Sequence, residues 1–354
     1  MPDTSDWTIG RLIEWTRAFF EKKGIPQPRL EAEILLAHVL AFERIDLYTR
    51  YDQPVDEETR ARFRDLIRRR ADHEPTRYLT GGCEFMSLAM KVTPDCLIPR
   101  PETELLVEAA LRLAGVTRPG SSGRPRPAGH PPLSPLPKGE GRVRGPLALW
   151  NAEPTAKQPP HPASPPSPQG EGLAGAPSPL SAIDLCTGCG CVAVSLAVYL
   201  PGCRITATDL SSAAIEVART NAASHSVADR LTFLEGDLYA PLEAAAVQPA
   251  DFLLANPPYV AEAEWNDLAP EIRGHEPRSA LVARPRGTEI IERILRGAPA
   301  YLRPGGTLLV EIAAGQGTAV SEIAGAVPGL GGAEILKDYA GLERILVARK
   351  EAAG

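Results

Sequence analysis

The chain has 354 residues, 36 prolines, 31 glycines and a formal net charge of −6. At ~100–200 residues per domain this length allows two or three domains, and a hydrophobic fraction of 44% excludes a wholly disordered protein. The longest largely apolar run, 192–200, has nine residues where a membrane helix needs ~20, and six cysteines are too few for a disulfide scaffold, so we expect a cytoplasmic protein.

Residues 1–90 carry a helical pattern and form the first expected domain. Apolar side chains recur at helical spacing between residues 30 and 40, and a second amphipathic segment runs from 56 to 70. Packing of these segments predicts a small helical bundle. Its consecutive arginines, Arg68 to Arg70, are expected to form a solvated face, with contact to a protein or RNA partner as the alternative.

The prolines concentrate in an insertion, residues 118–180, which follows a connector at 91–117. The insertion holds 17 prolines in 63 positions and no aspartate. Because proline has no backbone N–H and clashes with a helix interior, we expect an exposed, disordered segment with polyproline character; a docking site for a proline-recognising partner is the alternative. The insertion carries a net charge of +4, which leaves about −10 on the rest of the chain and disfavours nonspecific binding of nucleic acid.

Residues 181–354 alternate strand and helix patterns. Candidate strands lie at 182–185, 204–208, 231–234, 252–255 and 307–312, with a Pro-Gly-Gly turn at 304–306 and two later strands near 333–336 and 345–349. Helical segments between most of them predict an α/β fold with a mostly parallel sheet. Ligands bind such sheets at the carboxyl ends of the strands, which is where the remaining motifs fall.

The first candidate strand runs into a glycine loop, Asp184-Leu185-Cys186-Thr187-Gly188-Cys189-Gly190, with a helix behind it. Glycines allow a ligand to approach the backbone, and the helix N-terminus offers free N–H groups. The spacing also fits a dinucleotide fingerprint. Asp209 ends the second strand, where a carboxylate accepts hydrogen bonds from ribose hydroxyls, so NAD and S-adenosylmethionine both remain candidates.

Two further acids favour S-adenosylmethionine over NAD. Asp184, at the mouth of the first strand, would repel a pyrophosphate but suits an ammonium group. Asp237 ends the third strand, where it would accept the amino group of adenine. A capping role for Asp184 and a turn role for Asp237 are the alternatives.

Cys186 and Cys189 form a C-x-x-C pair inside the glycine loop, a spacing found in zinc and redox sites. No second such pair and no histidine pair stands at metal-binding spacing, and a metal ion here would occupy the space of the cofactor. We therefore expect no metal site and assign these small side chains to the lining of a tight turn.

The most informative motif, Asn256-Pro257-Pro258-Tyr259, follows the fourth strand. Two consecutive prolines fix the backbone and remove two backbone N–H donors. Nearby carbonyl groups are therefore free to accept hydrogen bonds from a ligand. The Asn256 side chain and the Pro257 carbonyl suit the two hydrogens of a planar NH2 group, on which the Tyr259 ring can stack. The alternative is a rigid loop without a catalytic role.

The Asn256–Tyr259 tetrapeptide, called the acceptor corner below, suits methyl transfer to an amide or aniline-like nitrogen. The lone pair of that nitrogen is delocalised, so two acceptors would favour pyramidalisation and aim the lone pair at an electrophilic methyl group. They would also stabilise the positive charge that grows on nitrogen. No strong general base is required, because the nitrogen becomes acidic once it is methylated.

Together these motifs resemble the release factor glutamine methyltransferase family, over nearly all of the chain except 118–180. The matching segments are the glycine loop, the tetrapeptide, Arg77 to Gly81, Leu97 to Glu104, Glu276-Pro277 with Ala280-Leu281, Glu311 to Gln316 and Asp338 to Arg344. The tetrapeptide is shared with DNA adenine methyltransferases, whereas the string from Ile98 to Glu104 is much more specific. Cys186 stands where the family commonly has Gly, Arg77 where it often has Gln, and Leu238 where it has an aromatic residue beside adenine.

The resemblance implies a class I S-adenosylmethionine-dependent methyltransferase domain with a Rossmann-like α/β fold, preceded by a small N-terminal helical bundle that engages a peptide chain release factor. The implied reaction moves a methyl group from S-adenosylmethionine to the side-chain amide nitrogen (N5) of Gln in a Gly-Gly-Gln motif. The implied cofactor contacts are Asp184, Cys186, Thr187, Gly188, Cys189, Gly190, Asp209, Asp237, Leu238 and Asn256. The implied substrate contacts are Arg100, Glu102 and the tetrapeptide (Asn256, Pro257, Pro258 and Tyr259), of which Asn256, Pro257 and Tyr259 are implied to be catalytic.

Other functions stay open from the sequence alone. N5-glutamine methylation of another protein, such as a ribosomal protein, fits the same motifs. Adenine-N6 methylation of nucleic acid would need a target-recognition domain and a basic groove, which a charge of about −10 disfavours. Asp184 and the tetrapeptide disfavour an NAD oxidoreductase, and the intact motif set disfavours a noncatalytic interaction protein. We expect a monomer that acts on protein, with no direct nucleic-acid substrate and no membrane contact.

Overall fold

The first domain is a bundle of five helices. The computed structural model describes residues 7–116 and 179–352. The helices are α1 (Ile9–Lys22), α2 (Pro28–Leu40), α3 (Arg44–Thr49), α4 (Glu57–Ala71) and α5 (Thr76–Thr80). Their apolar faces meet around Phe20, Leu35 and Phe63, each of which contributes about 2 kcal/mol by leaving water. Asp56 caps α4 by accepting a 2.8 Å hydrogen bond from the Thr59 N–H. The helical pattern predicted for this region is confirmed.

A β-hairpin leaves the bundle and enters the second domain. Its strands β1 (Gly82–Phe85) and β2 (Leu88–Lys91) are antiparallel, and all but the last residue of β2 fall in the range 1–90 that the sequence pattern assigns to helices. The hairpin packs into the core of the second domain rather than that of the bundle. Asn221 clamps it there, since its side chain accepts from the Lys91 N–H at 2.7 Å and donates to the Lys91 carbonyl at 3.0 Å. The connector continues through a 3₁₀ turn, η2 (Pro101–Thr103), into α6 (Glu104–Leu113).

The second domain is built on a seven-stranded sheet of order β5-β4-β3-β6-β7-β9-β8. The strands are β3 (Ser181–Leu185), β4 (Arg204–Asp209), β5 (Leu231–Glu235), β6 (Ala250–Ala255), β7 (Leu302–Glu311), β8 (Leu330–Lys337) and β9 (Glu343–Lys350). The first five are parallel, and β9 runs antiparallel to both of its neighbours. The predicted α/β fold with a mostly parallel sheet is therefore confirmed. The turn predicted at 304–306 instead lies inside β7, as an irregularity in its pairing with β6.

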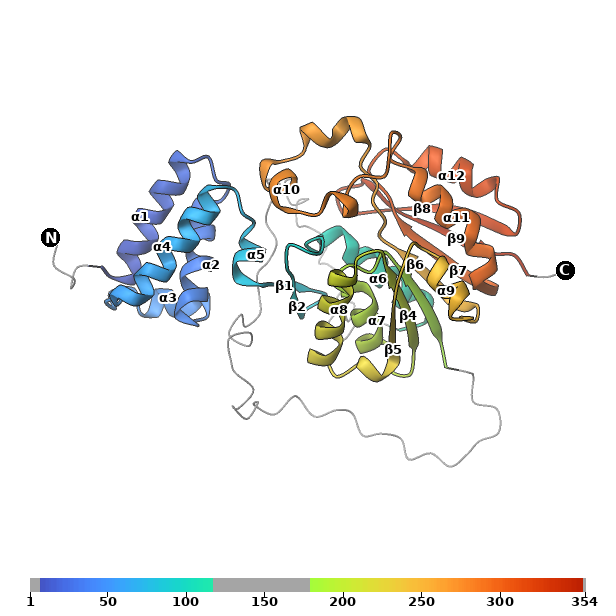
Figure 1. Ribbon diagram of the computed structural model, residues 1–354, viewed down its shortest axis with the longest axis horizontal. Helices are drawn as coiled ribbons and strands as arrows, with labels where there is room; N and C mark the ends of the chain where they lie inside the picture. The colour runs from blue at the N-terminus through green and yellow to red at the C-terminus, as the bar shows by residue number, and fades with distance from the viewer. Residues whose placement is uncertain (1–6, 117–178, 353–354) are drawn as a thin grey trace, which may run out of the picture.

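Helices cover both faces of this sheet (Figure 1). One core contains residues of α6, α7 (Cys191–Tyr199) and α8 (Ser212–Ser224), and the other contains residues of α9 (Ala240–Ala244), α11 (Glu289–Tyr301) and α12 (Gly317–Gly325). Successive residues of a strand alternate between the two cores: Ala182 faces the first and Ile183 the second. Burial on both faces explains the continuous apolar runs in these strands.

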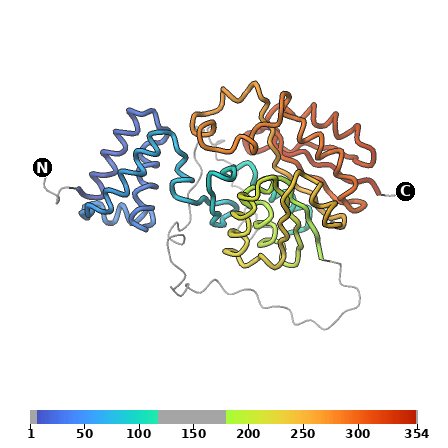
Figure 2. Tube along the Cα trace, in the orientation of Figure 1, coloured from blue at the N-terminus to red at the C-terminus, as the bar shows by residue number. Residues whose placement is uncertain are grey.

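The two domains touch through a segment that follows β6. This segment contains η5 (Glu262–Asp267), α10 (Pro270–His275) and η6 (Arg278–Ala280), and α10 extends toward the bundle (Figures 1 and 2). Arg70 of α4 is buried and donates to Glu31 at 2.9 Å and to Glu271 of α10 at 3.1 Å. The prediction that Arg68 to Arg70 form a solvated face is thus wrong for Arg70, because the helical turn carries its side chain into this junction.

The expected insertion at 118–180 lies almost entirely outside the described residues. Within the two described ranges, no helix combines the length and apolar content needed to cross a bilayer.

Candidate active site

The strand register brings the predicted site residues to one edge of the sheet. Leu185, Thr208, Ala255 and Val310 form a single rung across β3, β4, β6 and β7. The residues that follow this rung are Cys186, Asp209, Asn256 and Glu311. The glycine loop, the predicted ribose ligand and the tetrapeptide therefore start from neighbouring positions, although they are far apart in the chain.

The glycine loop leaves β3 through three residues with left-handed backbone conformations. Cys186 has φ 58°, Gly188 φ 55° and Gly190 φ 79°. A side chain at Gly190 would meet the Cβ of Ala218 at 2.9 Å, so this glycine allows the loop to pack against α8. A side chain at Gly188 would meet nothing within 4 Å, so the loop leaves open space there for a ligand to approach the backbone.

Two carboxyl groups, the buried Asp184 and the partly buried Asp209, hold this loop. Asp184 accepts a 2.6 Å hydrogen bond from the Thr187 hydroxyl, and burial raises its pKa to about 7. Asp209 accepts from the backbone N–H groups of Gly188 at 2.7 Å and Ser211 at 2.9 Å, and burial raises its pKa as well. A carboxylate has about four lone-pair positions, so Asp209 retains capacity for hydroxyl donors in addition to the loop.

Asp237 and Leu238, the residues predicted to lie beside adenine, already have partners within the chain. Asp237 is half-exposed and forms an ion pair with Arg293 of α11 at 2.7 Å. Leu238 has φ 50° and buries its side chain in the α9–α11–α12 core, while its carbonyl accepts from the Thr208 hydroxyl at 3.2 Å. Leu210, directly after Asp209, is 67% exposed.

The C-x-x-C pair is divided between the two faces of the sheet. Cys186 packs against the α9–α11–α12 core, whereas Cys189 is buried in the α6–α7–α8 core. Burial raises the pKa of the Cys186 thiol, and the pKa of Cys189 is raised as well, first by a hydrogen bond with Cys191. The two thiols do not face a common point, so they cannot share a metal ion. In the described parts of the chain, no cluster of three or more metal-ligating side chains occurs.

The tetrapeptide corner is held from two sides. Asn256 donates from Nδ2 to the Thr103 hydroxyl at 3.0 Å, and the Tyr259 carbonyl accepts from Gln316 Nε2 at 3.1 Å. Gly287 passes so close that a side chain there would lie 2.6 Å from the Tyr259 carbonyl. None of the described residues donates to Asn256 Oδ1 or to the Pro257 carbonyl, so both remain available as acceptors.

The predicted substrate residues of the connector are engaged within the chain. Arg100 donates to the buried Glu276 at 2.6 Å, and Glu276 also accepts from the Ile98 N–H at 3.3 Å. Glu102 lies 3.8 Å from Arg344 at the rim of the corner and is partly exposed. Arg100 therefore ties the connector to the segment after the tetrapeptide. From the sequence, Glu276 is recognisable only as part of the Glu276-Pro277 segment, and its pairing with Arg100 is not predicted.

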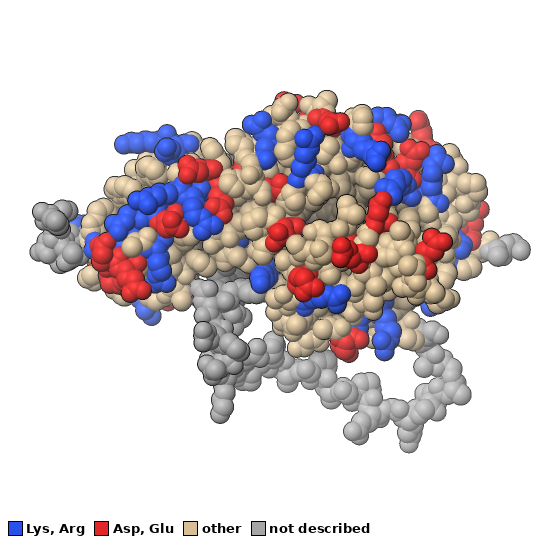
Figure 3. Space-filling view, viewed as in Figure 1, with Lys and Arg blue, Asp and Glu red and all other residues tan. Residues whose placement is uncertain are grey.

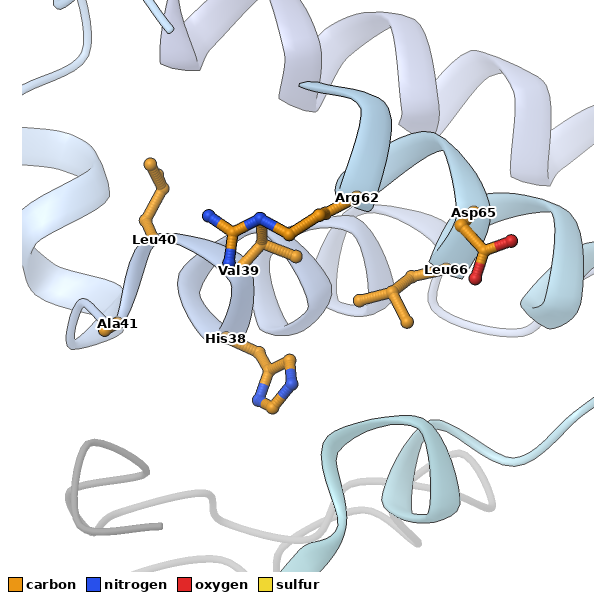
Figure 4. Close-up of a pocket in the computed structure, with 7 residues that line it drawn as sticks. All are labelled: His38, Val39, Leu40, Ala41, Arg62, Asp65 and Leu66. Carbon is orange, nitrogen blue, oxygen red and sulfur yellow. The ribbon is translucent and has the colours of Figure 1, made fainter. Parts of the chain in front are cut away.

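The surface offers other features away from this edge. A hollow of about 760 Å³ lies on the bundle between the end of α2 and α4, lined by His38 to Ala41 and by Arg62, Asp65 and Leu66 (Figure 4). It has neither the glycine loop nor the strand-end acids. On the face shown in Figure 3, basic side chains gather in a band across the bundle with acidic side chains beside them, whereas charges of both signs are scattered over the second domain.

Comparison with known proteins identifies the family. Residues 11–81 match the family model of the PrmC N-terminal domain, and residues 176–272 match the methyltransferase small domain. The chain is 36% identical to the release factor glutamine methyltransferase of Rhodopirellula baltica, over 99% of this chain and 100% of that protein. It is also 36% identical to the enzyme of that name from Chlorobaculum tepidum, over 97% of this chain and 98% of the relative. Both the bundle and the sheet are covered, and this chain belongs to the release factor glutamine methyltransferase family.

Proposed function

We propose that this protein transfers a methyl group from S-adenosylmethionine to the side-chain nitrogen of the Gln in the Gly-Gly-Gln motif of a peptide chain release factor. The observation that carries the proposal is the Asn256–Tyr259 corner, which presents two unoccupied acceptors one strand away from an open glycine loop. The names of the full-length relatives support the same substrate.

The residues of the loop fit the proposed cofactor. The open space at Gly188 admits a ligand against the backbone, and Asp209 has capacity for ribose hydroxyls. Asp184 lies buried beside the loop, where a cationic ammonium group would favour its charged form and lower its raised pKa. We assign Asp184, Gly188 and Asp209 to cofactor binding, with Asp237 as a further acceptor once it exchanges its partner Arg293. When bound, S-adenosylmethionine supplies an electrophilic methyl group on a sulfonium.

The tetrapeptide prepares the acceptor nitrogen for attack. Asn256 Oδ1 and the Pro257 carbonyl each accept one hydrogen of the glutamine NH2 group, and the Tyr259 ring stacks on its plane. These contacts orient the lone pair and stabilise the positive charge that develops on nitrogen. With S-adenosylmethionine bound, the glutamine nitrogen would form a C–N bond to the methyl group as the S–CH3 bond breaks, and it would then release one proton to water.

The bundle gives the protein a second surface for its large substrate. The Arg70–Glu271 ion pair links the bundle to the segment that follows the tetrapeptide, so a release factor held by the bundle would be presented to the corner in a defined orientation. All six cysteines carry free thiols, which fits the reducing cytoplasm in which we place the enzyme. We propose that it acts as a monomer.

The direct test is incubation of the purified protein with methyl-labelled S-adenosylmethionine and a purified release factor, followed by mapping of the label by mass spectrometry. We expect one methyl group on the Gln of the Gly-Gly-Gln motif. A release factor with that Gln replaced by Ala is the matched control and should stay unlabelled. Absence of transfer, or label at another residue, would overturn the proposal.

A further inference from the structure

The turn between β8 and β9 lies at the same edge of the sheet as the acceptor corner. Lys337 at the end of β8 pairs with Glu343 at the start of β9, so residues 338–342 form the turn. Glu311, the last residue of β7, pairs with Ile345 near the start of β9. Because β9 runs antiparallel to β7 and to β8, its turn with β8 projects from the edge at which β6 and β7 end.

The order of the strands separates this turn from the cofactor side. Strands β5, β4 and β3 form one half of the sheet, β6 with the acceptor corner is central, and β7, β9 and β8 form the other half. The glycine loop and Asp209 follow strands of the first half. The edge of the second half is therefore left for the polypeptide that delivers a glutamine to the corner.

The turn is within reach of a few residues of such a polypeptide. Asn256 follows Ala255, which is in register with Val310 of β7, so Asn256 stands level with Glu311 and, across β7, with Ile345. Two strand spacings separate Asn256 from Ile345, a distance of about 10 Å. An extended chain covers about 3.3–3.6 Å per residue, so roughly three residues beside the glutamine span from the corner to the turn.

Hydrogen bonds hold the turn in one shape. Asp338 Oδ1 accepts from the backbone N–H groups of Ala340 and Leu342, each at 2.9 Å. Its Oδ2 accepts from Arg344 Nε at 2.9 Å. Arg344 also lies 3.8 Å from Glu102 at the rim of the acceptor corner. The turn is therefore braced internally and linked to the acceptor side of the site.

This braced turn exposes two large apolar side chains. Tyr339 is 99% exposed, more than any other large hydrophobic side chain in the described ranges, and Leu342 is 44% exposed. The Tyr339 ring has almost no contact with the rest of the chain, so it adds almost nothing to the stability of the fold. A single exposed apolar side chain needs no explanation, but a pair on a braced turn beside the acceptor corner has the features of a docking surface.

We propose, on the basis of the function proposed above, that the Tyr339–Leu342 turn docks the Gly-Gly segment that precedes the glutamine to be methylated. Glycines have no side chain through which an enzyme could hold them, but their backbone allows a flat ring to approach closely. The Tyr339 ring packs against the peptide groups and Cα–H groups of the two glycines, and Leu342 extends the apolar surface. A methyl group on either glycine would lift the backbone from the ring.

Tyr339→Ala and Tyr339→Phe form the test pair, since phenylalanine keeps the ring. With S-adenosylmethionine saturating, we expect KM for the release factor to rise about tenfold in Tyr339→Ala and to stay within about twofold of wild type in Tyr339→Phe. In both variants kcat and the Kd of S-adenosylmethionine should be unchanged. An unchanged KM in Tyr339→Ala, or a fall in kcat in place of the rise in KM, would overturn the proposal.

Leu113→Ala is the matched control for loss of an exposed apolar side chain. Leu113 is 40% exposed and ends α6, about 14 Å along the helix from the connector. This variant should have the KM and kcat of wild type. A rise in KM as large as that of Tyr339→Ala would show a nonspecific surface effect and would overturn the docking role.

A release factor with Ala-Ala-Gln in place of Gly-Gly-Gln identifies the contact. The substitution should raise KM about tenfold more for wild type than for Tyr339→Ala, because the variant has already lost the ring against which the glycines pack. Equal increases for the two enzymes would show that the ring does not touch the glycines and would overturn the proposal.

Binding measured without turnover separates this inference from the proposed function. With S-adenosylhomocysteine, the demethylated cofactor, bound to the enzyme, the Kd of the unmethylated release factor is measured by calorimetry. We expect this Kd to be about tenfold higher for Tyr339→Ala than for wild type. That difference in a protein that transfers no methyl group would contradict the proposed function alone. Equal Kd values, or no binding by either protein, would overturn the docking role.

Discussion

The two sides of the candidate active site are built in different ways. The cofactor side is one continuous loop, 184–190, braced by the backbone contacts of Asp209. The acceptor side joins Thr103, Asn256 and Gln316, which come from three distant segments. Local backbone geometry should therefore govern cofactor affinity, whereas long-range contacts should govern the orientation of the acceptor. Substitutions on the two sides should separate Kd for S-adenosylmethionine from kcat.

The largest effect is expected on the acceptor side, from Asn256→Ala. This change removes one of two acceptors for the glutamine NH2 group, and we expect kcat to fall about 10²–10³-fold. Calorimetry should show that S-adenosylmethionine still binds, because Asp209 and the glycine loop are untouched. A kcat near the wild-type value would refute the role of Asn256. If the affinity for S-adenosylmethionine fell as much as kcat, the two sides of the site would not act separately.

Asp209→Ala tests the cofactor side. The variant loses the acceptor of the Gly188 and Ser211 N–H groups together with the expected ribose contact, so Kd for S-adenosylmethionine should rise about tenfold to hundredfold. At saturating cofactor, kcat should change little. Glu235→Ala is a matched control, since Glu235 is paired with Asp209 in the strand register and is exposed. Unchanged affinity in Asp209→Ala, measured by calorimetry, would contradict the assignment.

A smaller effect is expected from Gln316→Ala. Gln316 Nε2 donates to the Tyr259 carbonyl at 3.1 Å and to the Gly287 carbonyl at 3.3 Å, so its loss should loosen the tetrapeptide. We expect kcat to fall about tenfold with Kd for the cofactor unchanged. Gln248→Ala removes an exposed glutamine that bonds only its own loop and should leave kcat unchanged. A Gln316→Ala variant as active as Gln248→Ala would show that the tetrapeptide is rigid on its own.

The same difference in construction explains what the sequence could predict. The glycine loop, Asp209 and the tetrapeptide each follow a strand whose apolar pattern is plain, so their convergence at one edge follows from the parallel sheet. Both the fold class and the placement of Asn256 could therefore be derived before the structure.

The supporting contacts could not be derived in this way. Thr103 and Asn256 are 153 positions apart, and no local pattern shows that an η2 hydroxyl meets the end of β6. The split of Cys186 and Cys189 between two cores depends on left-handed backbone at Cys186, which the sequence does not signal because most such positions carry glycine. The hairpin at 82–91 is too short to show strand alternation within a helical region.

The smallest effect is expected from replacing the insertion. We predict that replacing residues 118–178 with a roughly ten-residue Gly/Ser linker leaves kcat and cofactor affinity unchanged. A shorter loop costs less entropy to close, so the variant should gain at most about 1.5 kcal/mol in free energy of unfolding. The replacement stops before Leu180, because its carbonyl accepts from the Arg204 N–H at 3.0 Å and positions the start of β3. A folded but inactive variant would show that the insertion contributes to one of the two sides, and separate measurement of Kd and kcat would identify which.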